Sequence, residues 1–298
     1  MSDLVLLAAG MARRYGGFKP LAPVGPCGEA IIDLTVYDAA EAGFDRVVLV
    51  VRKEIEGALS YHVKRCWPTS LEVELVCQDE DAAVEKLIAS GGKPPGTAHA
   101  VLVAARRLSG SFGVANADDL YSKDALCMLA DHLGAPNAEH ALVAFRLKNT
   151  VVSDSPVTRA TCVTDELGLL TEIHERTITP LGGGSFLGST DHGKQPLTGD
   201  ALVSVNLWGL RPSIVPVLES AVEPFLAAIG SGAKPTCDEV LLPVIIGSTL
   251  GKLGCFPVRV LTTESRCIGV THPSDLPKVQ AEVAKLVSLG LRPAQLWK

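Results

Sequence analysis

Short, continuous apolar runs recur along the first half of the chain, and they constrain its fold more than any other feature. They lie at residues 4–9, 47–51 and 112–115, and a further strand is expected at 73–76, where Glu74 interrupts the apolar residues. A run without polar alternation is typical of a strand that is covered on both faces. Segments with helical spacing lie between the runs, at residues 31–42 and 97–108. This alternation predicts an α/β fold with a mostly parallel sheet and helices on both faces.

The second half of the chain is less regular. We expect strands at 141–147, 160–164 and 202–205, and an amphipathic helix at 276–289 that ends before Gly290. Residues 181–199 are rich in Gly, Ser and Thr and predict a mobile excursion between strands. Because no internal repeat or clean linker is visible, we expect one domain with an elaborated second half.

Composition excludes several classes of protein. The chain has 298 residues and a formal net charge of -6, which argues against a general nucleic-acid binder. No apolar run approaches the roughly 20 residues that a membrane helix needs, and the run at 4–9 is too short for a signal peptide. We therefore expect a cytoplasmic protein with no nucleic-acid or membrane partner. The eight cysteines form no C-x-x-C pair and the seven histidines no H-E-x-x-H pattern, so a zinc site is not expected.

The loop after the first apolar run is cationic, although the protein is acidic. No Asp or Glu occurs between residues 4 and 28. Glycines let the backbone turn tightly, its N–H groups can then face an anion, and an arginine can clamp phosphate oxygens. The loop therefore predicts a phosphate site, with a solvated surface turn as the alternative. Its cations and glycines are Arg13, Arg14, Lys19, Gly10, Gly16 and Gly17.

Two familiar phosphate motifs do not fit this loop. A P-loop requires Ser or Thr after its lysine, but Pro20 follows Lys19, and Ala12 interrupts the dinucleotide fingerprint G-x-G-x-x-G. The stretch LAAGMARRYGGFKPL instead resembles the signature loop of the sugar-phosphate nucleotidyltransferases, with Arg14 and Lys19 at its Arg and Lys positions. Later segments resemble further motifs of that family in the same order. They lie at 93–100, 114–121, 172–176 and 203–209, and residues 268–297 resemble the UTP–glucose-1-phosphate uridylyltransferase branch.

The resemblance implies a fold and an activity. The expected fold is the Rossmann-like, mostly parallel mixed sheet of the nucleotide-diphospho-sugar transferases, in one nucleotidyltransferase domain over residues 1–298. Within it, we expect a nucleotide-binding half at 1–135 and a sugar-binding half with the C-terminal helix at 136–298. The implied reaction joins a nucleoside triphosphate, with UTP or dTTP favoured, to a sugar 1-phosphate and releases pyrophosphate. Mg²⁺ is the implied cofactor.

The resemblance also implies roles for individual residues. Arg14 and Lys19 would hold the triphosphate, and Asp118 would bind Mg²⁺, with Asp119 as the alternative ligand. Glu175 would bind sugar hydroxyls, and Arg176 the sugar phosphate, with Asn206 beside them. For Gln78 an exposed loop glutamine is the alternative, and for Glu175 and Arg176 a charged turn. The nucleotide-binding positions are Ala9, Gly10, Gln78, Gly96 and Thr97.

One departure from the family pattern concerns the metal. Gly269 stands where many relatives carry a second metal-binding aspartate. Either another acid closes the site, with Asp238 and Glu239 the nearest candidates in sequence, or the metal keeps extra waters, or the protein catalyses poorly.

Two other functions therefore remain open. They are a non-catalytic relative that binds nucleotide sugar, and nucleotidyl transfer to a non-sugar phosphate acceptor. An NAD-linked oxidoreductase is disfavoured because the dinucleotide fingerprint is missing. The sequence also leaves the oligomeric state open, with a homo-oligomer among the alternatives.

Overall fold

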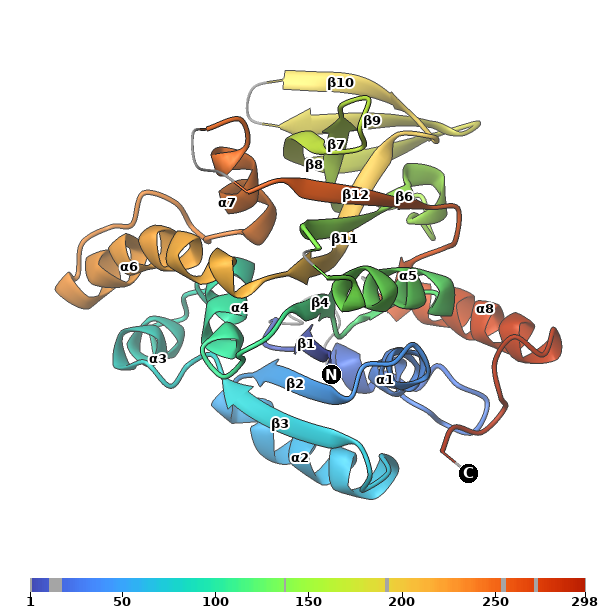
Figure 1. The fold of residues 1–298 in the computed structure, drawn as a ribbon. Helices are drawn as coiled ribbons and strands as arrows, with labels where there is room; N and C mark the ends of the chain where they lie inside the picture. The colour runs from blue at the N-terminus through green and yellow to red at the C-terminus, as the bar shows by residue number, and fades with distance from the viewer. Residues whose placement is uncertain are drawn as a thin grey trace.

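The computed structural model describes residues 2–10, 18–136, 138–190, 193–252, 256–270 and 273–297. Its main element is a sheet of eleven described strands in the order β10-β9-β8-β7-β11-β4-β1-β2-β3, with β6 pairing both β11 and β12 (Figure 1). The strands are β1 (Asp3–Leu7), β2 (Arg46–Val51), β3 (Glu72–Cys77), β4 (Phe112–Asn116), β6 (His140–Arg146), β7 (Val157–Thr164), β8 (Leu170–Gly182), β9 (Ser185–Thr190), β10 (Gly193–Thr198), β11 (Leu202–Leu210) and β12 (Val258–Thr263). Two short strands, β5 (Asp119–Leu120) and β13 (Ile268–Gly269), form a separate pair.

Helices cover both faces of the sheet, so the predicted fold class is confirmed. One face packs against α4 and α6 through a core that includes Val101, Trp208 and Val222. The other packs against α1, α2 and α5 through a core that includes Val36 and Leu126. The described helices are α1 (Ile31–Glu41), α2 (Lys53–Cys66), α3 (Ala82–Ala89), α4 (Thr97–Ala105), α5 (Lys123–Gly134), α6 (Val215–Ser231), α7 (Leu242–Thr249) and α8 (Leu276–Ser288).

The parallel part of the sheet comes from the apolar runs of the first half. Strands β4, β1, β2 and β3 are parallel neighbours, and Leu7 at the end of β1 lies opposite both Val50 and Asn116. The carboxyl ends of these strands therefore lie along one edge, which is where open α/β sheets bind ligands. The segments that follow β1, β3 and β4 contain most of the predicted nucleotide-binding positions.

Strand β11 joins the two halves of the sheet. Strand β6 pairs with one of its edges, and β7 and β4 share the other. Ser204 lies opposite Ala160 of β7, whereas Trp208 lies opposite Val114 of β4. The start of β7 therefore lies close to the end of β4, with Asn206 between the two pairings.

The prediction of a mobile excursion over residues 181–199 is wrong. The chain there completes β8 and forms β9 and β10, which pair antiparallel. Three glycines at 182–184 all have positive φ and make the turn between β8 and β9. A hairpin on an exposed sheet edge uses the same Gly, Ser and Thr residues as a loop, so composition alone did not separate the two.

Residues Pro212–Ser231 form one helical stretch that is long and apolar enough to cross a membrane by length and composition. Only 28% of its apolar window is buried, but Leu218, Val222 and Phe225 pack into the core of the domain. A core helix of a soluble protein meets the same criteria, so this stretch is weak evidence for a membrane span.

Candidate active site

The first predicted site residues follow β1 at the carboxyl edge of the sheet. The Ala117 backbone N–H donates to the carbonyl of Leu7 at 3.1 Å, which ties the ends of β1 and β4 together. Ala9 is buried, and its carbonyl accepts a hydrogen bond from Arg52 Nε at 3.0 Å. Gly10 is exposed, and a Cβ there would meet no atom of the described residues within 4 Å. Gly10 thus lies at an open end of the strand, as a ligand-facing position requires.

Lys19 and Asp118 meet at this edge. Lys19 opens a short 3-10 helix, Lys19–Leu21, and its Nζ lies 3.6 Å from Asp118 Oδ2. The side chain of Lys19 is 17% exposed and that of Asp118 37%. Arg14, the other predicted cation of the loop, lies outside the described residues.

The surroundings of Asp118 disfavour its negative charge. Burial, followed by the neighbouring charge of Asp119, raises the pKa of Asp118 to about 6, and Lys19 opposes both effects. Because water still reaches over a third of the side chain, solvent moderates these effects. A carboxylate in this setting is stabilised by any additional cation beside it.

Asp119 fills the space next to Gly269. The two residues lie opposite each other in the pairing of β5 with β13. A Cβ at Gly269 would overlap Asp119 Oδ1 and lie 3.2 Å from the Asp118 carbonyl oxygen. By contrast, the Glu239 carboxylate pairs with Lys93 Nζ at 3.2 Å. Of the acids considered from the sequence, Asp119 is therefore the one that adjoins Gly269.

A chain of hydrogen bonds leads from Asp119 to β11. Asn116 Nδ2 donates to Asp119 Oδ2 at 2.8 Å, and Asn206 Nδ2 lies 3.5 Å from Asn116 Oδ1. Trp208 Nε1 then donates to Asn206 Oδ1 at 3.3 Å. Asn206 has φ 60°, in the left-handed region that asparagine tolerates better than most residues. The structure thus connects predicted Asn206 with the Asp118–Asp119 turn.

Gln78 and Gly96 are also brought together. Gln78 Nε2 donates to the Gly96 carbonyl at 3.0 Å and lies 3.2 Å from His99 Nδ1. Gly96 has φ 104°, and a Cβ on it would lie 2.6 Å from the Val240 carbonyl oxygen. Thr97 Oγ1 accepts from the backbone N–H of Leu242 at 2.9 Å. The glycine is thus required by the close approach of residue 240, and Gln78 is buried rather than an exposed loop residue.

Glu175 and Arg176 are consecutive in β8 and therefore point to opposite faces of the sheet. Burial, followed by the charge of Glu239, raises the pKa of Glu175. Arg176 Nε donates to Thr161 Oγ1 at 3.0 Å. The predicted turn alternative is excluded for this pair, because both residues lie within a regular strand.

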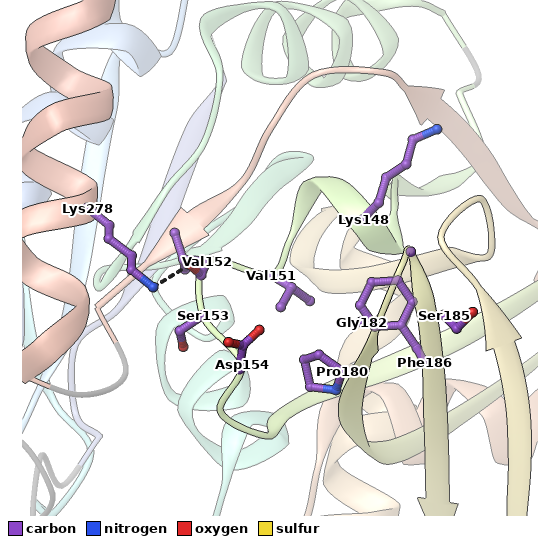
Figure 2. Close-up of a pocket in the computed structure, with 11 residues that line it drawn as sticks. Lys148, Val151, Val152, Ser153, Asp154, Pro180, Gly182, Ser185, Phe186 and Lys278 are labelled. Atoms are coloured by element: carbon purple, nitrogen blue, oxygen red, sulfur yellow. Dashed lines mark hydrogen bonds between the residues drawn. The ribbon is translucent and has the colours of Figure 1, made fainter.

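Two cavities lie near these residues. One, of about 360 Å³, lies between α4 and α6 and is lined by Gln78, His99 and Arg106, among others. Another, of about 250 Å³, lies beside the β8–β9 turn and α8, with Lys148 and Lys278 on its walls (Figure 2). None of the predicted site residues lines this second cavity.

The donor set at Asp118 suits a hard cation. Within the described ranges, no group of three or more His, Cys, Asp and Glu side chains is arranged to hold a metal. Mg²⁺ is commonly held by one or two carboxylates together with substrate phosphates, so it needs no such group. The carboxylates of Asp118 and Asp119 supply oxygen donors of that kind, and Lys19 already places a positive charge beside Asp118.

Sequence reasoning missed two contributors to this arrangement. Arg52 is buried behind Ala9, and Asn116 links Asp119 to Asn206. The position of Asn116 directly after an apolar strand was the available signal for the second. Arg52 carries no comparable sequence signal, because its partner is a backbone carbonyl.

Comparison with known proteins gives a family and a fold. The profile of one family, described as a MobA-like NTP transferase domain, matches residues 4–162. Among curated proteins, none matches the chain. Solved structures with a similar fold include the inositol-1-phosphate CTP transferase from T. maritima, with 14% identity, a TM-score of 0.65, and 96% of each chain covered.

Two further structures are similar over nearly the whole chain. UDP-glucose pyrophosphorylase from Acinetobacter baumanii has 16% identity and a TM-score of 0.60, with 98% of this chain and 99% of that one covered. A putative glucose-1-phosphate thymidylyltransferase from Bacillus anthracis has 13% identity and a TM-score of 0.64, with 95% of each chain covered. At these identities the likeness shows the fold.

Proposed function

Because the chain belongs to the MobA-like NTP transferase family, and is thus a nucleotidyltransferase, we propose that it joins a nucleoside triphosphate to a sugar 1-phosphate. The products are a nucleoside diphosphate sugar and pyrophosphate. An oxygen of the sugar phosphate attacks the α-phosphorus, and pyrophosphate leaves with the bonding electrons. UTP and dTTP are the favoured triphosphates.

The meeting of Lys19 with Asp118 is the observation that carries this proposal. Phosphoryl-type transfers depend on positioning and on charge neutralisation more than on covalent help from the protein. Lys19 supplies positive charge for the triphosphate beyond the end of β1. Arg14, which lies outside the described residues, is proposed to hold the triphosphate as well. Asp118, with Asp119 beside it, would hold Mg²⁺, which neutralises phosphate charge when bound.

The nucleotide is proposed to lie along the ends of β1, β3 and β4. Gly10 offers an open backbone, and Gln78 and Gly96 are joined by a hydrogen bond at 3.0 Å. With its amide nitrogen committed to Gly96, Gln78 retains its carbonyl oxygen as an acceptor for the N–H of a uracil or thymine ring. Ala9 and Thr97 complete this side through their backbone positions.

The acceptor is proposed to lie across β11, beside Glu175, Arg176 and Asn206. We accordingly propose one domain over residues 1–298, with a nucleotide-binding half at 1–135 and a sugar-binding half at 136–298. The continuous sheet supports the single domain, because β11 pairs with strands of both halves. A polyol phosphate acceptor is the second candidate, since one of the similar structures is an inositol-1-phosphate CTP transferase.

A pyrophosphate-release assay tests the proposal. The four ribonucleoside triphosphates and dTTP are each combined with Mg²⁺ and with glucose 1-phosphate, other sugar 1-phosphates or inositol 1-phosphate. We expect release with UTP or dTTP and a sugar 1-phosphate, and a loss of orders of magnitude in turnover for Arg14→Ala in a folded protein. A preference for purine triphosphates, or near-normal turnover in that variant, contradicts the proposal.

A further inference from the structure

Two arginines lie directly opposite each other in the antiparallel pairing of β7 with β8. They are Arg159 and Arg176. Residues that are directly opposite in such a pair project from the same face, with Cβ atoms about 4.5–5.5 Å apart, and like charges there destabilise the sheet. A pair of guanidinium groups at this position therefore needs a source of negative charge.

No carboxylate in the described part of the chain forms an ion pair with either arginine. Arg159 donates to two backbone carbonyls, from Nη1 to Thr158 at 2.8 Å and from Nη2 to Thr150 at 2.8 Å. Its Nε is buried and has no hydrogen-bond partner among the described residues. Arg176 uses its Nε for the Thr161 hydroxyl.

Other arginines of this acidic protein are neutralised locally. Arg146 Nε lies 2.8 Å from Glu264, and Arg266 Nη1 lies 2.8 Å from Glu282. The chain has more Asp and Glu than Lys and Arg residues, and several of its arginines lie beside a carboxylate. The absence of such a partner at the β7–β8 pair is what marks it as a site for an external anion.

The pair lies beside the candidate active site. Ala160 is opposite Ser204 of β11, so the preceding residue, Arg159, lies towards Asn206. Side chains alternate along β7, and Ala160 belongs to the core on the α4 and α6 face. Arg159 therefore points to the other face of the sheet, where Cys267 is buried.

Backbone contacts place Arg159 near the two aspartates. Arg159 Nη2 donates to the Thr150 carbonyl. The carbonyl of the preceding residue, Asn149, accepts the backbone N–H of Cys267 at 3.1 Å. Two residues beyond Cys267, Gly269 lies opposite Asp119 in the pairing of β13 with β5. Arg159 thus lies near the segment that pairs with the proposed metal-binding acids.

We propose that Arg159 and Arg176 together bind the phosphate group of the acceptor, a phosphate monoester. This inference rests on the proposed function and adds Arg159 to the acceptor site. A phosphate dianion matches the charge of two guanidinium groups, whose planar donors suit its oxygens. The carbonyls of Thr150 and Thr158 hold the guanidinium plane of Arg159 in place before the ligand arrives. Asn206 remains available to the hydroxyls of the same molecule, whereas Glu175 points to the opposite face of the sheet.

The triphosphate is the other source of phosphate, and position favours the acceptor. Lys19 and the cationic first loop follow β1, which is separated from β7 by two strands, β4 and β11. The arginine pair lies on the β7–β8 side, next to the residues proposed for the acceptor. Substitution of Arg159 should therefore weaken binding of the acceptor and leave binding of the triphosphate unchanged.

The test is a steady-state comparison of wild type, Arg159→Gln, Arg159→Lys and Arg176→Gln. Arg65→Gln is the matched control, because Arg65 is exposed and, among the residues that the structure describes, bonds only to the Tyr61 hydroxyl. Gln at 159 retains a donor for the two carbonyls but removes the charge. We expect this variant to raise the acceptor KM by about 10- to 100-fold, with the triphosphate KM within about threefold of wild type. Lys at 159 should recover part of the loss.

The outcomes separate the inference from the function on which it rests. Absence of pyrophosphate from wild type with every substrate pair contradicts the proposed function. If wild type turns over and Arg159→Gln has an unchanged acceptor KM, the proposal that the arginine pair binds the acceptor phosphate is overturned. The role of Arg159 would then be to hold the backbone at Thr150 and Thr158. An equal rise in the triphosphate KM overturns the assignment to the acceptor.

Direct binding tests the pair even without turnover. Calorimetric titration of wild type with inorganic phosphate at low salt should show binding that Arg159→Gln and Arg176→Gln each lose and that Arg65→Gln keeps. Equal binding by wild type and Arg159→Gln overturns the inference.

Discussion

Two buried histidines should make the stability of this protein fall steeply below neutral pH. His99 is 3% exposed and His140 2%, and burial lowers the pKa of each from 6.5 to about 4. Both accept a hydrogen bond at Nδ1, from Gln78 Nε2 at 3.2 Å and from the Arg211 backbone N–H at 3.3 Å. On protonation, Nδ1 of each ring would carry a hydrogen and would face the N–H group that now donates to it.

The magnitude follows from proton linkage. The unfolded chain takes up a proton near pH 6.5 and the folded chain near pH 4, so the stabilisation is complete above pH 6.5 and is lost as the pH falls towards 4. Integration from about pH 8 to about pH 5 gives a loss of about 2 kcal/mol per histidine. The two together remove about 4 kcal/mol, a large fraction of the roughly 5–15 kcal/mol typical of a domain.

Asn at each position tests this reasoning, because its side chain can retain an acceptor near Nδ1 without titrating. Urea unfolding of wild type, His99→Asn and His140→Asn is followed by circular dichroism at about pH 8 and about pH 5. Each variant should be destabilised at the higher pH but lose about 2 kcal/mol less than wild type between the two. His174→Asn, with a 53% exposed side chain, is the control and should follow wild type.

Comparison with wild type is essential because one buried carboxylate acts in the opposite direction. Burial raises the pKa of Asp38 to about 6, so its protonation on acidification favours the folded state. That contribution cancels in the difference between each histidine variant and wild type. A pH dependence that is the same in His99→Asn, His140→Asn and wild type would refute the argument.

Three further predictions concern the site and its supports. Lys19→Met should lower kcat/KM for pyrophosphate release by about 10²- to 10³-fold and leave urea unfolding within about 1 kcal/mol of wild type, because the partly exposed ion pair with Asp118, at 3.6 Å, contributes little to stability. Gly96→Ala should cost about 2–4 kcal/mol in urea unfolding, since it combines φ 104° with a Cβ 2.6 Å from the Val240 carbonyl oxygen, and unchanged stability would contradict it. Arg292→Met leaves the carboxylate of Asp38 buried without its partner and should cost about 3–5 kcal/mol, most of which Asp38→Leu in the same chain should recover.

The sequence predicted the fold best where helices cover both faces of a strand. The runs at 4–9, 47–51 and 112–115 each contain a strand, because continuous apolar side chains require burial on both sides, and the segment at 73–76, interrupted by Glu74, forms the edge strand β3. The meeting of Lys19 with Asp118 also followed from sequence, since the ends of parallel strands share an edge. The same argument did not reach β9 and β10, which carry no continuous apolar run. The residues of β10 are largely exposed, and β9 buries only Phe186 and Gly188.

Contacts that depend on the register between strands could not be predicted from the sequence. Arg159 faces Arg176 only because β7 pairs with β8 in one particular register. A shift of one residue would turn Arg159 to the other face of the sheet. Neighbouring motifs fix which segments lie at the site, but they do not fix which side chains oppose each other across it.

Gly269 and Asp119 show this dependence most clearly and make it testable. Aspartate at 269 would place its Cβ on Asp119 Oδ1, so Gly269→Asp should destabilise the protein by about 1–3 kcal/mol. Asp119→Gly should also destabilise it, because Asn116 Nδ2 loses its acceptor. In the double variant the new carboxylate enters the space that the old one vacates. The double variant should therefore be more stable than the sum of the single changes predicts, by about 1 kcal/mol or more.

Urea unfolding of the four proteins at about pH 8 measures this coupling. Gly110→Asp is the matched control, because Gly110 is exposed and a Cβ there would meet nothing within 4 Å. Additive single effects would mean that residue 269 and Asp119 do not compete for one space. In that case a glycine at 269 would have to be explained by something other than the carboxylate opposite it.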